Sequence, residues 1–120
     1  MNFEFDDRGT GPALLFFPGS YSTASAWRGV QKALSGSYRL MSTSLPGYGA
    51  TPEMRSLSDS TIDRMTDFVA QVVSRAGEPV HLVGHSFGGL SLFAAVLHQK
   101  VSAESLITFE ANPVVTRPVS

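Results

Sequence analysis

The segment Gly84-His85-Ser86-Phe87-Gly88 has the residue types and spacing best suited to chemistry in this chain. The short apolar stretch 80–83 precedes it, and a run of small and apolar residues typical of a helix follows. A serine at a sharp strand-to-helix turn presents its hydroxyl at the end of a sheet. We therefore predict that Ser86 is a nucleophile. Gly84 and Gly88 fit this turn because a Cβ atom would clash where the strand and the helix approach each other.

Ser86 also has a purely structural interpretation. Serine is a preferred N-cap of helices, because its hydroxyl accepts a hydrogen bond from a backbone N–H of the first turn. A nucleophilic serine instead needs a histidine base and a carboxylate that orients the base. The Gly-x-Ser-x-Gly spacing favours the nucleophile, so the next question is where such a base could come from.

The chain has three histidines, and each is a poor candidate for the base. His81 is expected in mid-strand, packed or hydrogen-bonded against a helix. His85 is expected to point away from the Ser86 hydroxyl and to pack or hydrogen-bond beneath the site. His98 is expected near the far end of the following helix, on the order of 15 Å away at the rise of an α-helix. We therefore expect the catalytic histidine beyond Ser120, and little or no turnover from these residues alone.

The composition of the chain argues against several classes of partner and site. The chain is 42% hydrophobic and 16% charged, and its net charge of −1 predicts no nucleic-acid partner. The absence of cysteine excludes disulfides, thiolate metal sites and a cysteine nucleophile. The acidic N-terminus differs from a signal peptide, and the apolar runs are too short to span a membrane. We expect a cytoplasmic protein that binds a small molecule and uses no cofactor or metal.

Short apolar stretches alternate with amphipathic ones, which predicts an α/β fold with a mostly parallel sheet of about five strands flanked by helices. The length of 120 residues suits a single domain. Strands are expected at Asn2–Phe5, Ala13–Phe17, Tyr38–Ser44, Val80–Val83 and Ser105–Phe109. Helices are expected at Ala24–Leu34, from Ser58 or Ser60 to Ala76, and at Gly88–Lys100. Residues 110–120 are expected to form a loop or tail.

Further stretches occur in a fixed order along the chain. Leu14–Ser20, with Trp27 shortly after, is similar to a strand, an oxyanion loop and a Trp-containing helix. The segment 44–51 is similar to the loop after the next strand, and 110–113 to the segment after a later one. With the Gly-x-Ser-x-Gly turn, these stretches resemble the α/β-hydrolase superfamily over nearly the whole chain. The resemblance runs from about the second strand to the sixth, which implies a partial domain without the C-terminal strands and the lid.

Two positions depart from the family pattern. Pro18 stands where the family usually has histidine, and Ser44 stands where it usually has aspartate. Both positions support loops, so the departures concern loop geometry and not the nucleophile.

The resemblance implies a serine-dependent hydrolase acting on an ester or a similar small acyl substrate. It implies an oxyanion hole formed by the backbone N–H groups of Ser20 and Phe87, which would stabilise the charge that develops on the substrate carbonyl. Tyr21 and Tyr48 are candidates to line the substrate pocket. Glu110 is a candidate catalytic acid, with a structural role in its loop as the alternative.

Two other functions remain open. One is a non-catalytic binding or assembly domain of the same fold. Leu106–Phe109 would then be an exposed edge of the sheet, covered by a second copy of the chain or by a completing chain. The other is a different reaction on the same scaffold, such as that of a haloperoxidase, a C–C hydrolase or a lyase.

Overall fold

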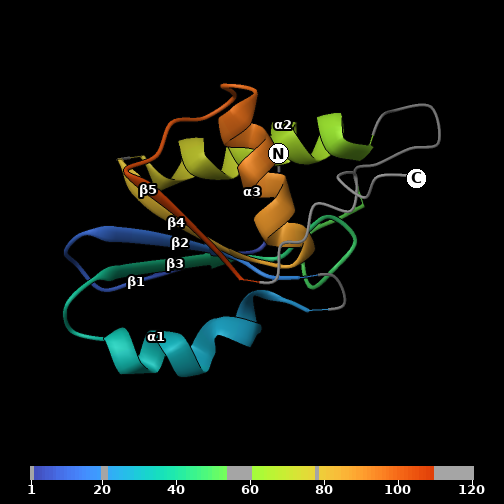
Figure 1. Ribbon diagram of the computed structural model, residues 1–120. Coiled ribbons are helices and arrows are strands. Elements are labelled where there is room, and N and C mark those ends of the chain that lie inside the picture. Colours follow the sequence, from blue (N-terminus) through green and yellow to red (C-terminus); the bar gives the residue numbers. More distant parts are fainter. Residues whose placement is uncertain (1, 20–21, 54–60, 78, 110–120) are drawn as a thin grey trace, which may run out of the picture.

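The computed structural model describes residues 2–19, 22–53, 61–77 and 79–109 (Figure 1). Its strands are β1 (Phe5–Arg8), β2 (Ala13–Phe17), β3 (Arg39–Thr43), β4 (Val80–His85) and β5 (Ser105–Phe109). Its helices are η1 (Ala24–Trp27), α1 (Arg28–Leu34), α2 (Thr61–Ala76) and α3 (Phe87–Leu97). The strands form a 5-stranded sheet in the order β1-β3-β2-β4-β5. Only β1 pairs antiparallel, which confirms the predicted fold class.

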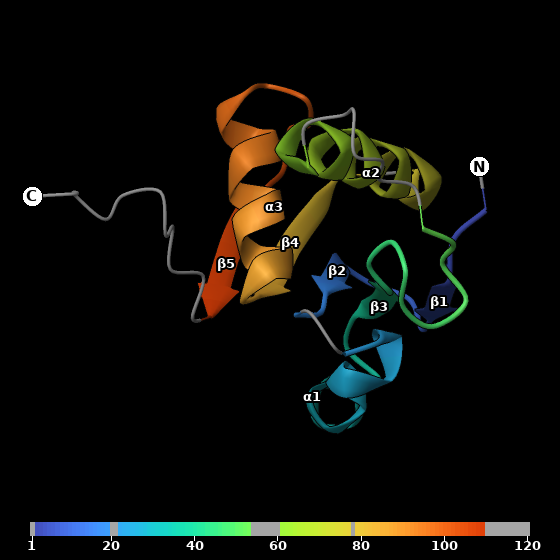
Figure 2. The same cartoon turned by 90° about the vertical axis from the view of Figure 1, so that its right-hand side faces the viewer.

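Helices cover the two faces of the sheet unequally. Figure 2 shows α2 and α3 on one face, while α1 lies on the other beneath β2 and β3. The main core fills the space under α2 and α3, where the inward-facing residues of α2 are fully buried: Met65, Phe68, Val69 and Val72. On the α1 face, Phe16, Trp27, Leu40 and Val83 form a smaller cluster. Among the residues that the structure describes, no helix is long and apolar enough to cross a membrane.

The first strand differs from the prediction. It spans Phe5–Arg8 instead of Asn2–Phe5, and Arg8 belongs to the strand while the turn follows at Gly9 (φ 83°). The cause is pairing with a strand distant in sequence, because Phe5–Arg8 lie opposite residues 40–43 of β3 in an antiparallel register. The Arg39 guanidinium adds hydrogen bonds to both carboxylate oxygens of Asp7 at 3.0 and 2.7 Å. Arg39 also donates to the carbonyl of Ala76 at 3.0 Å, which ties the end of α2 to the same point.

The other elements follow the prediction with local corrections. The segment 24–34 is a short 3-10 helix that continues into α1, and α2 begins at Thr61 among the described residues. β4 continues through Gly84 to His85, two residues beyond the predicted end at Val83. α3 ends at Leu97 instead of Lys100 because Gln99 adopts a positive φ of 58° and the Lys100 N–H turns back to the Ala95 carbonyl at 2.8 Å.

Candidate active site

Ser86 lies at the junction of β4 and α3 with a backbone conformation that serine rarely adopts, φ 53° and ψ −123°. Such a conformation costs about 1–3 kcal/mol and persists only where the surroundings fix it. Here the Ser86 N–H donates to the carbonyl of Phe109 at 2.9 Å, and the Ser86 carbonyl accepts from Leu90 at 2.9 Å. The Ser86 side chain makes no cap hydrogen bond to α3. The backbone therefore makes a sharp turn between strand and helix, and the Ser86 hydroxyl does not cap α3.

Two glycines allow this turn. A Cβ atom at Gly84 would lie 2.6 Å from the Cα atom of Gly89, so the strand and the helix approach too closely for any side chain. A Cβ atom at Gly88 would collide with the carbonyl of Pro18 and would lie 2.9 Å from that of Phe17. The close approach of β4 to α3 thus accounts for Gly84, whereas Gly88 leaves space for the end of β2 and the loop after it.

The loop after β2 approaches Ser86 directly. A Cβ atom at Gly19 would lie 3.2 Å from the Cβ atom of Ser86 and 3.0 Å from Nδ1 of His85. Phe87 is the first residue of α3, where backbone N–H groups have no acceptor within the helix. Three predicted site residues, Ser20, Tyr21 and Glu110, lie outside the described residues. Gly19, in the stem of the predicted oxyanion loop, thus lies next to Ser86, and Phe87 follows Ser86 directly in the chain.

A cavity of about 550 Å³ opens beside this junction on the α1 face of the sheet. Its wall is largely apolar and includes Trp27 and Val30 from the helices and Ile107 and Phe109 from β5. Gly19 and His85 also line it, which connects it to the turn at Ser86. The contribution of β5 could not be predicted from the sequence, because the face of the sheet on which its side chains lie depends on its pairing with β4.

The comparisons with known proteins agree with this geometry. The model of the alpha/beta hydrolase family matches residues 14–119. This chain belongs to the alpha/beta hydrolase family. It is 32% identical over 113 residues to a pimeloyl-[acyl-carrier protein] methyl ester esterase of Aeromonas salmonicida, covering 94% of this chain and 43% of the relative. Other relatives carry the same name, among them one of Aeromonas hydrophila that is 29% identical over 113 residues, covering 94% of this chain and 43% of the relative.

Solved structures of hydrolases share the fold. An alpha/beta hydrolase fold protein from Burkholderia ambifaria superposes with a TM-score of 0.78 at 19% identity, over 88% of this chain and 39% of that one. An epoxide hydrolase from Vigna radiata superposes with a TM-score of 0.77 at 30% identity, over 88% of this chain and 35% of that one. The chain therefore spans less than half the length of these proteins.

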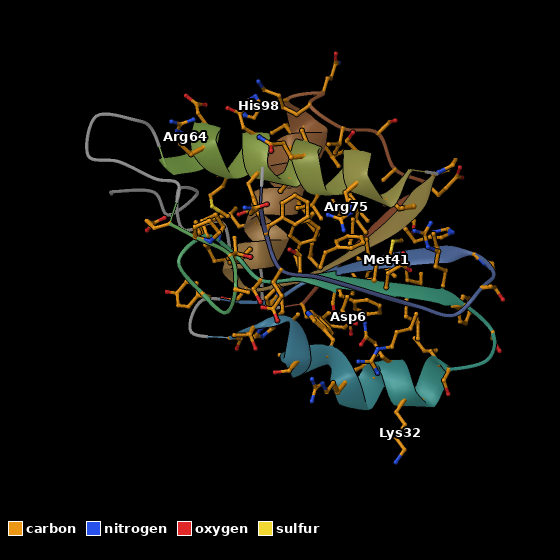
Figure 3. The ribbon with its side chains drawn as sticks, turned by 180° about the vertical axis from the view of Figure 1, so that it is seen from behind. Asp6, Lys32, Met41, Arg64, Arg75 and His98 are labelled. Carbon is orange, nitrogen blue, oxygen red and sulfur yellow. The ribbon has the colours of Figure 1, made fainter. Side chains whose placement is uncertain are left out.

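The three histidines of this chain lie in different environments. His81 Nδ1 is 2.8 Å from the Ser105 hydroxyl, so its partner is on the neighbouring strand β5 and not on a helix as predicted. His85 is half-buried and borders the cavity beside Gly19. His98 is exposed and follows the last residue of α3, at the opposite end of that helix from Ser86. Figure 3 labels His98. The base therefore remains unassigned among the described residues.

Tyr48, a candidate for the pocket, and Trp27, in the helix after the loop, lie in different parts of the structure. Tyr48 is partly buried against the core cluster beneath α2 and does not line the cavity. Trp27 is buried, packs on Phe16 with ring centroids 5.0 Å apart, and also lines the cavity. A role for Tyr48 in the pocket stays a prediction, whereas Trp27 contributes to both the core and the cavity wall.

A polar cluster lies at the end of β3. The Ser44 hydroxyl accepts a hydrogen bond from the backbone N–H of Ala24 at 2.8 Å and donates to Oε1 of Glu4 at 2.5 Å. The same carboxylate oxygen accepts from the N–H of Ala50 at 3.2 Å, and the Glu4 N–H donates to the Thr51 hydroxyl at 2.9 Å. The sequence did not indicate Glu4, because its partners lie 40 or more positions away.

Proposed function

We propose that this chain carries the nucleophile of a serine-dependent esterase, and that the nucleophile is Ser86. The observation that carries the proposal is the backbone of Ser86 at φ 53° and ψ −123°, with no hydrogen bond from its side chain to the helix. A strained turn that displays a hydroxyl without using it structurally is what a nucleophile requires.

The reaction would proceed through an acyl-enzyme. Ser86 Oγ forms a bond to the carbonyl carbon of the ester while a histidine base takes its proton, and the charge moves to the carbonyl oxygen. The N–H groups of Phe87 and Ser20 would stabilise this oxyanion, one such donor typically contributing about 3 kcal/mol. The C–O bond then breaks, the alcohol leaves with the proton from the histidine, and water releases the acid. We place the histidine in sequence outside these 120 residues, and Glu110 remains a candidate acid.

The substrate class follows from the cavity and the relatives. The apolar wall of the cavity beside Gly19 and His85 suits a hydrocarbon chain more than a charged group. The relatives named pimeloyl-[acyl-carrier protein] methyl ester esterase act, by that name, on a methyl ester of an acyl chain. We propose that the substrate here is likewise a small ester of an acyl chain.

The outer edge of β5 is expected to be covered in the working protein. Ile107 is 46% exposed and Phe109 is 51% exposed, on a strand whose only described partner is β4. An apolar edge strand with unpaired backbone groups pairs readily with another strand. We propose that a completing chain segment or a second copy covers this edge, and that full activity requires this cover.

A fluorophosphonate probe tests the nucleophile. The whole gene product that contains this chain is incubated with the probe, and the labelled peptide is located by mass spectrometry. We expect labelling at Ser86 and its loss in Ser86→Ala. Ser102→Ala, at an exposed serine beyond α3, serves as the control and should retain the label. A folded protein that takes up no label, or a Ser86→Ala variant that is still labelled, would contradict the proposal and favour a non-catalytic binding domain.

A further inference from the structure

We propose that Glu4 is a positioning residue for the active site, acting through Ser44 on the loop that leads from β2 to η1. The inference deepens the proposed function and rests on it, because this loop contains Ser20, the second proposed oxyanion donor. Glu4 itself touches no reacting atom. Its carboxylate fixes the far end of the loop from outside the site.

The first step is the anchoring of Ala24. The N-cap position of η1 is Thr23, whose side chain does not cap the helix and lies instead 2.9 Å from the Ser25 hydroxyl. The N–H of Ala24 is satisfied by the hydroxyl of Ser44 at 2.8 Å. Ser44 is fully buried at the end of β3, so it is a fixed point. The loop is thus held at one end by the close approach of Gly19 to Ser86 and at the other by Ser44.

The second step is the orientation of the Ser44 hydroxyl. A serine hydroxyl has one hydrogen, and it accepts from Ala24 reliably only where that hydrogen points elsewhere. The carboxylate of Glu4 takes that hydrogen at 2.5 Å. A hydrogen bond to an ionised acceptor is shorter and about twice as strong as a neutral one. Glu4 therefore holds the hydroxyl in the orientation that leaves its lone pair for Ala24.

The third step is the loop after β3. Oε1 of Glu4 also accepts from the N–H of Ala50 at 3.2 Å, so one carboxylate oxygen links this loop to Ser44. A Cβ atom at Gly49 would collide with that oxygen and would lie 2.8 Å from the Ser44 hydroxyl oxygen. Glycine at 49 leaves the space that the carboxylate occupies. The loop after β2 and the loop after β3, both at the carboxyl ends of their strands, are thus held by the same carboxylate.

The anchor also explains a departure of the sequence. Position 44 is serine where the family pattern usually has aspartate, so the chain lacks a carboxylate on β3 itself. The structure supplies one from the N-terminal segment, because the carboxylate of Glu4 reaches the hydroxyl of Ser44 across 40 positions of sequence. The charge is present at this point of the fold but comes from another element.

Moving the carboxylate from position 4 to position 44 tests the proposal in the whole gene product. Glu4→Ala removes the anchor, and we expect kcat for a p-nitrophenyl ester to fall about 10- to 100-fold with little change in KM, because misplacement of a stabilising group costs rate more than binding. Ser44→Asp alone crowds two carboxylates and should also be slow. The double variant Glu4→Ala with Ser44→Asp should recover kcat to within about threefold of the parent.

Asp6→Ala is the matched control, since Asp6 is a nearby carboxylate that contacts the exposed Arg8, and kcat should stay within about twofold. An unchanged kcat in Glu4→Ala, or a double variant no faster than Glu4→Ala, would overturn the proposal.

A second readout separates this proposal from that for Ser86. Amide hydrogen exchange at Ala24 and Ala50 should quicken in Glu4→Ala and slow again in the double variant, whether or not Ser86 is the nucleophile. If Ser86→Ala retains esterase activity, the proposed function fails while the exchange result still reports on the anchor. Unchanged exchange at Ala24 in Glu4→Ala would overturn the anchor itself.

Discussion

The turn at Ser86 and the polar anchor at Ser44 both lie at the carboxyl ends of parallel strands, but the residues that form them are distributed differently along the chain. The turn uses consecutive residues, Gly84 to Gly89, with the sharp bend fixed by close packing of strand on helix. The anchor joins Glu4, Ser44 and Ala50 through hydrogen bonds across 40 or more positions. The turn therefore depends on a short stretch of sequence, whereas the anchor forms only when β3 and the N-terminal segment have come together.

Both regions exclude a side chain by means of a glycine, but the excluded atom meets different neighbours. At Gly84 it would meet the backbone of Gly89, which is fixed by the helix. At Gly49 it would meet a glutamate oxygen and a serine hydroxyl, which can move. The turn should therefore tolerate substitution less than the anchor does.

The largest effect is expected for Gly84→Ala. The new Cβ atom would lie 2.6 Å from the Cα atom of Gly89, so β4 and α3 must separate, and we expect the free energy of unfolding to fall by about 3 kcal/mol. Urea unfolding measures this. Gly29→Ala is the control, because nothing lies within 4 Å of a Cβ atom there, and in a helix the change should stabilise by about 0.5–1 kcal/mol. A loss below about 1 kcal/mol at Gly84 would mean that the turn is not tightly packed.

A smaller effect is expected for Gly49→Ala. Gly49 has φ 55°, and alanine in this region costs about 1–2 kcal/mol before any contact is considered. Gly36→Ala separates the two causes, since Gly36 has φ 89° but nothing within 4 Å of a Cβ atom. Thermal unfolding of both variants should show Gly49→Ala as the less stable. Equal losses would show that the carboxylate of Glu4 does not fill the space beside Gly49.

The smallest effect concerns Asp7, the carboxylate at the other end of the first strand. The hydrogen bonds from Arg39, aided by the charges of Arg39 and Arg75, hold the pKa of the Asp7 carboxyl below its usual range, against a weaker opposing effect of burial. A depressed pKa stabilises the fold at pH values above the unfolded pKa, and the gain is lost as pH falls through the folded pKa. Asp7→Asn should therefore cost about 0.5 kcal/mol at neutral pH, an exposed pair being weak.

Unfolding experiments at neutral and acidic pH, at low and high salt, check this last expectation. The difference between Asp7→Asn and the parent should shrink in acid and at high salt. A difference that stayed constant across both would show that Asp7 acts through packing and not through charge. The two carboxylates can then be compared directly. Removal of Glu4, which anchors two loops, should lower kcat, whereas removal of the exposed Asp7 should lower only the free energy of unfolding.

The sequence predicted most of the fold because its signals are local. Strand Ala13–Phe17 and strand Ser105–Phe109 have the predicted bounds. The first is a continuous apolar run, and the second is a short run rich in β-branched and aromatic residues, and both patterns indicate a strand directly. The first strand lies at Phe5–Arg8 instead of Asn2–Phe5 because its position depends on antiparallel pairing with β3, which the polar sequence of the strand does not reveal. His81 was likewise expected to contact a helix, but the parallel pairing of β4 with β5 places Ser105 beside it.

The sequence by itself determined the turn at Ser86, because the glycines that permit it are adjacent in the chain and their spacing reports the packing of strand on helix. Tertiary structure alone decided the cavity wall at Ile107 and Phe109, and the anchor of Glu4 on Ser44. The register of β5 with β4 decides which side chains of β5 lie on the cavity side of the sheet. The anchor depends on a hydrogen bond between segments 40 positions apart. No local pattern encodes either, because each contact forms only when the sheet has assembled.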